Sequence, residues 1–228
     1  MPADRPRPRV CVLHTVAALP AVFDPLLREL APDADAYHVV DESLLADTVA
    51  HGPLPRTAAR LASYVTAAAT AGADAVLVTC SSMGPFAEAA RPLVDIPVLR
   101  VDEPMAAQAV AHGPRIAVLA TLESTLRPTT DLVQRHAARA GAHITVTTTT
   151  CPGAHQARIA GDTARHDELV AAEARRLTAD HDVLVLAQAS MATVVDRMPA
   201  GQITVPVLTS PRAGTAQLAA LSPREEPA

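Results

Sequence analysis

Short apolar runs bounded by turn residues recur along the chain and predict β-strands. Most of these runs lack the alternation of apolar and polar residues that marks a strand with one solvent-exposed face. Near-continuous apolar runs are typical of strands buried on both faces, as in a parallel sheet. The predicted strands are Val10–His14, Tyr37–Val40, Ala75–Thr79, Pro97–Val101, Ile116–Ala120, Ile144–Thr149, Val183–Ala187 and Val205–Leu208.

Between these runs lie stretches rich in alanine and leucine whose apolar positions follow the helical period. Alternation of strands and helices predicts an α/β protein with right-handed crossovers. The predicted helices are Ala21–Leu30, Pro55–Ala71, Met105–His112, Leu126–Ala140, Thr163–Ala179 and Ala213–Leu221.

Three segments of the chain occur twice and in the same order. "RVCVLHT" (9–15) resembles "RIAVLAT" (115–121), "DAVLVTCSSMG" (74–84) resembles "DVLVLAQASMA" (182–192), and "IPVLR" (96–100) resembles "VPVLT" (205–209). The offsets are 106, 108 and 109 residues, a drift that loop-length variation explains. The repeat predicts two pseudo-symmetric, mostly parallel-sheet α/β halves. Their ranges are 9–112 and 113–209, with 210–222 packing back onto the first half.

In each half, the second repeated segment reads as a strand that ends where a helix begins. Ligands in open parallel sheets gather at the carboxyl ends of strands. We therefore expect one active-site cleft between the halves, with Cys80 and its counterpart Gln188 on opposite walls.

Composition narrows the range of functions. With 49% hydrophobic and 19% charged residues among 228, the chain is globular, and its net charge of −5 argues against nucleic-acid and anionic-membrane surfaces. All 19 basic residues are arginine, which excludes both a Schiff-base lysine and the lysine of a P-loop. The histidines form no H-E-x-x-H motif, so no metal site is expected. Three cysteines and no apolar stretch of membrane-spanning length favour a cytoplasmic protein.

Cys80 is the first candidate for chemistry, because it follows an apolar strand and precedes the predicted start of a short helix. The positive end of that helix would lower the pKa of the thiol. Backbone N–H groups and the hydroxyls of Ser81 and Ser82 could hold a carboxylate beside it. The structural alternative is that Cys80 is a small buried apolar residue.

The "VTCSS" segment (78–82), "VLATLEST" (118–125), "HDEL" (166–169) and the repeat together resemble the aspartate/glutamate racemase superfamily. That group includes glutamate and hydantoin racemases, maleate isomerase and arylmalonate decarboxylase, and the resemblance covers residues 9–212. It implies a cofactor-independent enzyme acting beside the carboxylate of a small acid. Homodimers are common in the group, so the resemblance also allows a homodimer.

In family racemases two cysteines work on opposite faces of the substrate, whereas here the second is replaced by Gln188, whose amide does not titrate. The resemblance implies Cys80 as acid/base. Candidates for a replacement base are His14, Cys151, His155, His166 and Glu168. Implied substrate-binding residues are Thr15, Ser81, Ser82, Thr121, Ser124, Thr125, Ala189 and Ser190.

Several of these candidates have structural alternatives. His14 could instead bond a neighbouring loop, Glu168 could be an ordinary first-turn glutamate of its helix, and Ser124 could be an N-cap. Cys151 precedes Pro-Gly and reads as a loop residue.

Three functions stay open at this point. The first is a racemase or isomerase that uses Cys80 as acid/base. The second is a single-cysteine decarboxylase or lyase that protonates an enolate from one face. The third is a non-catalytic carboxylate-binding protein.

Overall fold

A computed structural model of the chain describes residues 7–198 and 201–221. The chain divides into two compact units. The first holds the described residues up to Val101 and from Pro211 onward, and the second is Asp102–Ser210. In the described residues each unit carries a four-stranded sheet whose strand pairs are all parallel, which confirms the predicted α/β fold class.

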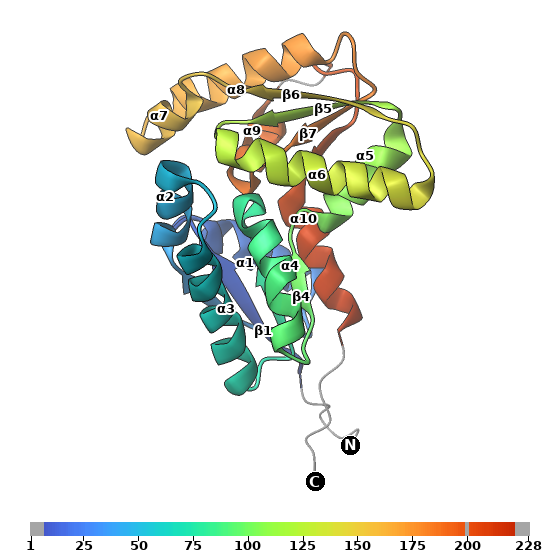
Figure 1. Cartoon of the computed structure of the whole chain (residues 1–228). Helices are drawn as coiled ribbons and strands as arrows, with labels where there is room; N and C mark the ends of the chain where they lie inside the picture. The colour runs from blue at the N-terminus through green and yellow to red at the C-terminus, as the bar shows by residue number, and fades with distance from the viewer. Residues whose placement is uncertain (1–6, 199–200, 222–228) are drawn as a thin grey trace. The chain divides into compact units, whose positions relative to one another are not determined.

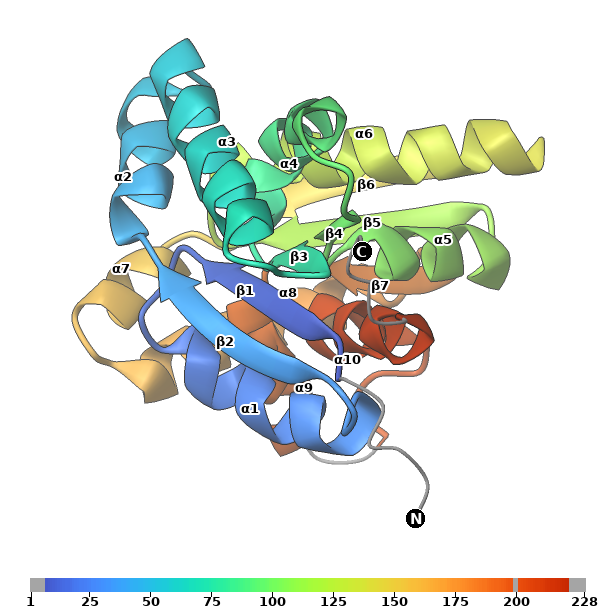
Figure 2. The same ribbon diagram turned by 90° about the horizontal axis from the view of Figure 1, so that it is seen from below.

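The sheet of the first unit has the strand order β2-β1-β3-β4. Figure 2 shows α1 and α10 on one face of this sheet and α3 and α4 on the other. The strands are β1 (Arg9–His14), β2 (Asp35–Val40), β3 (Ala75–Val78) and β4 (Val98–Arg100). The helices are α1 (Leu19–Leu30), α2 (Glu42–His51), α3 (Pro55–Thr70), α4 (Gly84–Ala90) and α10 (Ser210–Ala216). Short 3₁₀ turns are η1 (Ser81–Met83), η2 (Arg91–Leu93) and η4 (Gln217–Ala220).

The sheet of the second unit repeats this order as β6-β5-β7-β8. Figure 1 shows α6 along one face and α8 along the other. The strands are β5 (Arg115–Ala120), β6 (Thr145–Thr150), β7 (Val183–Leu186) and β8 (Val207–Thr209). The helices are α5 (Glu103–His112), α6 (Glu123–Ala140), α7 (Ala154–Ile159), α8 (Thr163–Leu177) and α9 (Ala192–Arg197), and a 3₁₀ turn η3 (Ala189–Met191) precedes α9.

The repeat seen in the sequence is also a repeat of hydrogen bonds. Asp74 Oδ2 accepts the backbone N–H of Arg9 at 2.6 Å, and Asp182 Oδ2 accepts that of Arg115 at 2.9 Å. In both units an aspartate just before one central strand therefore fixes the start of the other. All residues of β3 and β7 are buried, as their unbroken apolar sequences predict.

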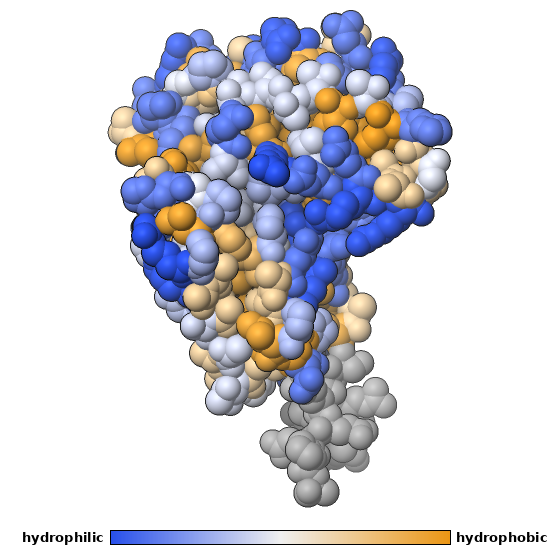
Figure 3. All heavy atoms as spheres, in the orientation of Figure 1, coloured by the Kyte–Doolittle hydropathy of each residue, from blue (hydrophilic) through white to orange (hydrophobic). Residues whose placement is uncertain are grey.

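Helix α3 shows why alanine-rich segments fold here. Thr57, Leu61, Val65 and Ala68 form its buried stripe at helical spacing, and Pro55 occupies its first position, where no N–H partner is needed. Figure 3 shows apolar residues gathered over α3 and α4 on the face that it draws. Many of these are small alanines, which favour the helix while exposing little apolar area.

The structure differs from the predicted division of the chain at α5. The sequence-based division put residues up to 112 in the first half, whereas α5 belongs to the second unit. Met105, Ala106 and Ala109 are buried in one cluster with Ile116 and other residues of the second sheet. Helix α5 therefore belongs to the second unit because its buried residues pack in the core of that unit. Residue 222 of the predicted C-terminal segment lies outside the described residues.

Two helices were not predicted, α2 and α7, and α9 was predicted only as a helix that begins after the repeated segment 182–192, without bounds. Helix α2 buries only Leu44 and Thr48, so its apolar period is weak. Its start is instead set by Asp41, whose side chain accepts the N–H of Ser43 at 3.0 Å. Helices α7 and α9 have six residues each, too few to show a period in sequence.

Candidate functional site

Cys80 and Gln188 occupy the same structural position in the two units. Each is the second residue after its strand, and each precedes a 3₁₀ turn. Their backbones match, with φ/ψ of −116°/116° at Cys80 and −120°/133° at Gln188. The carbonyl of each accepts a hydrogen bond from the methionine three residues on, at 3.0 Å from Met83 and 2.9 Å from Met191. The repeat therefore presents a thiol at one strand end and an amide at the other.

The thiol of Cys80 is not activated in the way that the sequence suggested. Burial is the largest influence on its pKa and raises it. Hydrogen bonding from the Thr15 hydroxyl, the Met83 N–H and Ser82 lowers the pKa only in part. Helix α4 begins at Gly84, one 3₁₀ turn beyond the thiol, so a helix dipole does not outweigh burial. The prediction of a lowered pKa was wrong, and the resting form is the protonated thiol.

This pKa direction has a chemical consequence for Cys80. Because the thiolate is the nucleophile, alkylation of Cys80 by iodoacetamide should be slow at neutral pH. We expect the rate to rise only above the ordinary cysteine pKa, as measured by mass spectrometry of the Cys80 peptide across a pH series. A rate that already levels off near pH 7 would contradict the raised pKa.

Buried hydroxyl groups surround Cys80 in the first unit. Thr15, Ser81 and Ser82 are all buried, with at most 5% of each residue exposed. Ser81 Oγ has no hydrogen-bond partner. Thr15 Oγ1 makes no hydrogen bond of ordinary geometry, although its hydroxyl is close enough to the sulfur to lower the thiol pKa. Buried hydroxyls normally find a partner, so these two indicate room for a polar ligand group.

His14, at the end of β1, belongs to a chain of hydrogen bonds within the first unit. Its Nδ1 lies 2.9 Å from Thr79 Oγ1, and its Nε2 lies 2.8 Å from His38 Nδ1. His38 Nε2 in turn lies 2.9 Å from Asp24 Oδ1. Thr79 donates its hydroxyl to the Leu13 carbonyl at 3.1 Å, so it accepts from His14 Nδ1–H. His14 Nε2 is then the acceptor in its contact with His38 Nδ1.

This environment holds His14 neutral. Its pKa is lowered to about 3, chiefly by burial; the charge of His38 also lowers it, while that of Asp24 opposes the shift. Single-sequence reasoning identified His14 but missed His38 and Asp24. The register offered a signal, because β1 and β2 pair Val12 with His38, which puts His38 on the same sheet face as His14.

In the second unit Gln188 is held by Thr121, the residue after β5. Gln188 Oε1 accepts the backbone N–H of Thr121 at 2.5 Å and its hydroxyl at 2.9 Å. Thr121 corresponds in the repeat to Thr15, which interacts with Cys80. In both units a threonine that follows one central strand contacts the residue two positions after the other central strand: Thr15 contacts Cys80, and Thr121 contacts Gln188.

The other predicted residues of the second unit lie in several environments. Thr125 and Ala189 are buried, while Ser124 and Ser190 are partly exposed. Helix α6 begins at Glu123 with Leu122 as its N-cap, so Ser124 is not the cap. Glu168 lies on the exposed side of α8, in its second turn rather than its first, and pairs with Arg165 at 2.7 Å.

The remaining candidates for a replacement base are buried to different degrees. His166 is 2% exposed, its Nδ1 lies 2.9 Å from Asp167 Oδ1, and its Nε2 has no partner. The pKa of His155 is lowered by burial and by the charges of Arg158 and His166. Cys151 packs in the apolar core of the second unit, where burial raises its pKa. Cys151 therefore has a packing role in this core, as the structural alternative for this residue predicted.

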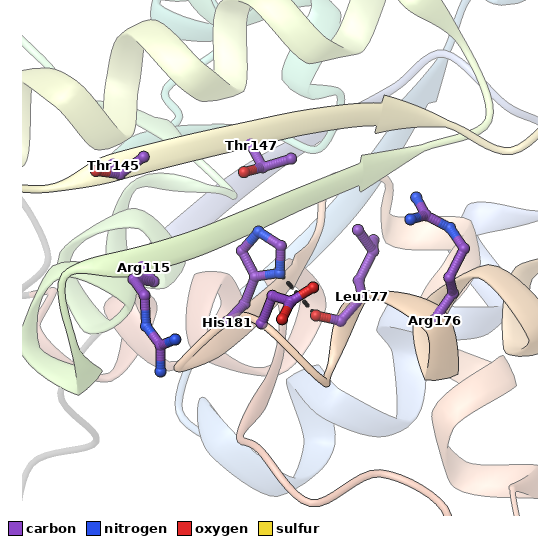
Figure 4. A pocket seen from close by; sticks show the side chains of 7 residues that line it. Arg115, Thr145, Thr147, Arg176, Leu177 and His181 are labelled. Atoms are coloured by element: carbon purple, nitrogen blue, oxygen red, sulfur yellow. Dashed lines mark hydrogen bonds between the residues drawn. The ribbon is translucent and has the colours of Figure 1, made fainter.

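A pocket of about 390 Å³ lies at the opposite, amino-terminal end of the second sheet. Figure 4 shows it between the starts of β5 and β6 and the end of α8. Its two arginines are already paired, Arg115 with Asp182 and Arg176 with Glu173. His181 Nδ1 lies 2.7 Å from the Leu177 carbonyl. None of the sequence-predicted site residues lines this pocket, and ligands of parallel sheets bind at the other strand ends.

The described part of the chain shows neither a metal-binding cluster nor a membrane-spanning helix. There, no group of three or more histidine, cysteine, aspartate or glutamate side chains could hold a metal ion. None of the helices described has the length and apolar character that crossing a bilayer requires.

Comparison with known proteins identifies what the chain is similar to. The model of the family described as Asp/Glu/Hydantoin racemase matches residues 14–218. No curated protein matches the chain. Among solved structures, a glutamate racemase isoform from Bacillus anthracis is similar with a TM-score of 0.69 at 18% identity, covering 94% of this chain and 81% of that one.

Two further structures show the same fold. An allantoin racemase from Klebsiella pneumoniae has a TM-score of 0.68 at 18% identity, with 92% of this chain and 86% of that chain covered. A putative Asp/Glu racemase from Yersinia pestis has a TM-score of 0.68 at 15% identity, with 93% and 97% covered.

Proposed function

The chain belongs to the Asp/Glu/hydantoin racemase family, and on that premise we propose that it is a cofactor-independent racemase or isomerase of a small acid. In this proposal Cys80 exchanges a proton with the carbon next to the substrate carboxylate. The observation that carries it is the partly exposed Cys80 at the end of β3, flanked by the buried Ser81 hydroxyl, which has no partner, and by the Thr15 hydroxyl, which acts on the sulfur.

The chemistry follows from what these groups can do. Cys80 first releases its S–H proton to water. The thiolate then takes the proton from the carbon, and the electron pair of the broken C–H bond moves onto the carboxylate as a planar enediolate. A proton from water on the opposite face gives the inverted acid, and return of the proton by the Cys80 thiol gives exchange with retention. Hydroxyls of Thr15 and Ser81 would donate hydrogen bonds to the carboxylate oxygens, which carry more charge in the enediolate than in the ground state.

A one-face decarboxylase or lyase is the second candidate, and two observations favour it. Cys80 rests as a protonated thiol because burial raises its pKa, and its counterpart in the repeat is an amide. In a decarboxylation the C–C bond breaks, carbon dioxide leaves, and its electron pair forms an enediolate. The Cys80 S–H proton then adds to carbon, and water reprotonates the thiolate.

Hydrogen exchange in deuterium oxide tests the proposal. The wild-type chain would be incubated with each enantiomer of glutamate and aspartate and with a monosubstituted malonate, and proton NMR would follow the C–H signal beside the carboxylate. We expect exchange or decarboxylation with at least one acid. Cys80→Ser should slow it about 10³-fold, because a positioned acid/base contributes about 10² to 10⁴.

Cys151→Ser is the matched control, since Cys151 also follows a strand but is packed in the core of the second unit. It should keep the wild-type rate, and circular dichroism would verify the fold of both variants. Inverted product supports the racemase, and deuterated product of one configuration supports the one-face enzyme. Undiminished turnover in Cys80→Ser would refute the role of the thiol, and binding without turnover would support a non-catalytic protein.

A further inference from the structure

The amide of Gln188 has a fixed orientation within the second unit. Its oxygen accepts two hydrogen bonds from Thr121, one from the backbone N–H at 2.5 Å and one from the hydroxyl at 2.9 Å. A backbone N–H can only face an acceptor, so the oxygen and not the nitrogen of the amide must point at Thr121. Thr121 is 7% exposed, which shields both bonds from competing water.

The amide nitrogen is the part of Gln188 left for a ligand. Among the residues that the structure describes, none accepts a hydrogen bond from Nε2. Gln188 is partly exposed, so its NH₂ group is accessible at the carboxyl end of β7. Both oxygen lone-pair directions are taken, and the group carries two hydrogens that can only be donated.

We propose that Gln188 is a fixed hydrogen-bond donor for an oxygen of the ligand, and not a substitute for a proton-transferring base. The ligand group at this position is a carboxylate, carbonyl or enediolate oxygen. This deepens the proposed function, on which it rests for a small acid as ligand. It assigns oxygen binding, and not proton transfer, to Gln188.

The repeat explains how one scaffold supports both roles. In each unit a threonine after the first strand reaches the central residue after the third strand. Thr15 acts on a thiol, where its hydroxyl lowers the pKa. Thr121 acts on an amide, where its N–H and hydroxyl fix the oxygen. The same threonine position therefore tunes a proton donor in one unit and orients a hydrogen-bond donor in the other.

Two substitutions of Gln188 distinguish the effect of its hydrogen-bond donor from the effect of its side-chain size. Gln188→Glu keeps an oxygen for Thr121 but presents a second oxygen to the ligand, which reverses the polarity. Gln188→Met has similar length and no donor. Gln134→Met, on the exposed side of α6, is the matched control.

NMR of the full-length ¹⁵N-labelled protein tests the proposal in two steps. The side-chain NH₂ signals of Gln188 are assigned by their loss in Gln188→Glu. We expect the transverse ¹⁵N relaxation of the Gln188 NH₂ group to be as fast as that of the backbone, whereas that of the exposed, mobile Gln134 NH₂ group should be slower. Titration with malonate, succinate, and D- and L-glutamate should shift the Gln188 signals. The apparent Kd should rise about ten-fold or more in Gln188→Met and Gln188→Glu, the cost of a hydrogen bond to a charged group.

Each other result overturns the proposal. A mobile Gln188 amide, no response to any of the four acids, or unchanged affinity in Gln188→Met would do so, and Gln134→Met must bind like wild type. These outcomes are independent of the proton exchange measured with Cys80→Ser. A rigid, acid-responsive amide with no loss of exchange in Cys80→Ser would contradict the proposed function alone.

Discussion

Replacement of Gly84 by alanine is expected to lower the free energy of unfolding by about 3 kcal/mol. A Cβ atom at this position would overlap Cζ, Nη2 and Nε of Arg100. Arg100 is 1% exposed and its Nη1 lies 2.7 Å from Glu88 Oε1, so the buried guanidinium cannot move aside without disturbing its ion pair with the partly exposed Glu88. Alanine in place of glycine favours the helix by about 1 kcal/mol at most, and overlap therefore outweighs propensity. Urea denaturation would measure the change.

The second unit supplies the control for this prediction. Ala192 and Thr209 occupy the positions in the repeat that Gly84 and Arg100 occupy in the first unit. An alanine is tolerated there because no arginine extends from β8 beneath it. We expect Gly84→Ala/Arg100→Thr to lose less than the sum of the single variants, with a coupling of about 1 to 2 kcal/mol. A Gly84→Ala variant as stable as wild type would show that the close approach is not rigid.

Acidification should destabilise the protein through His14. Its pKa in the fold is about 3, against 6.5 for an ordinary histidine. Below pH 6.5, His14 of the unfolded chain therefore binds a proton, whereas His14 of the folded chain binds one only near pH 3. Stability from this group is complete above pH 6.5 and falls with pH across that window, by about 1.4 kcal/mol per unit and up to about 5 kcal/mol in total.

The main cause is burial of the ring, and the charge of His38 adds to it. Protonation would put a positive charge on a ring whose centroid lies 5.0 Å from that of the His38 ring, and the two repel each other. Asp24, with about half of its side chain exposed, offsets this repulsion only in part. The His14 ring is 0% exposed, and the loss of hydration is the larger part of the free-energy cost of protonating it in the fold.

The measurement compares pH slopes rather than absolute stabilities. Unfolding free energies at pH 7 and pH 5 would be determined for wild type and for His14→Asn and His14→Gln, which stay neutral throughout. Wild type should lose about 2 kcal/mol more than either variant between the two pH values. Equal slopes in all three proteins would mean that His14 takes up a proton as readily in the folded as in the unfolded chain.

Elements with long apolar signals could be read from the sequence. All eight predicted strands are present within two residues of their predicted bounds. The signal is clearest for β3 and β7, where burial on both faces demands unbroken apolar runs. Helices α2 and α7 were missed because α2 depends on a cap and α7 has only six residues. The start of α2 depends on the N-cap hydrogen bond of Asp41, and one capping residue is too weak a sequence pattern to predict a helix.

The candidate site was partly readable for a similar reason. Cys80 and Gln188 were found because the repeat aligns them, and the structure gives them matching backbones. His38 and Asp24 were not found, because β2 and α1 bring them to His14 through register and packing. Glu168 was predicted as catalytic, yet α8 carries it on its exposed side with Arg165.

The sequence alone determined the α/β class, the duplication and the exchange of a thiol for an amide between the two copies, because periodicity and repetition are local properties of the chain. The tertiary structure decided that α5 joins the second core, that Cys80 rests protonated, that His14 stays neutral and that the Gln188 oxygen is occupied by Thr121. Each of these depends on desolvation or on hydrogen bonds between residues far apart in sequence. Such contacts exist only once the chain has folded.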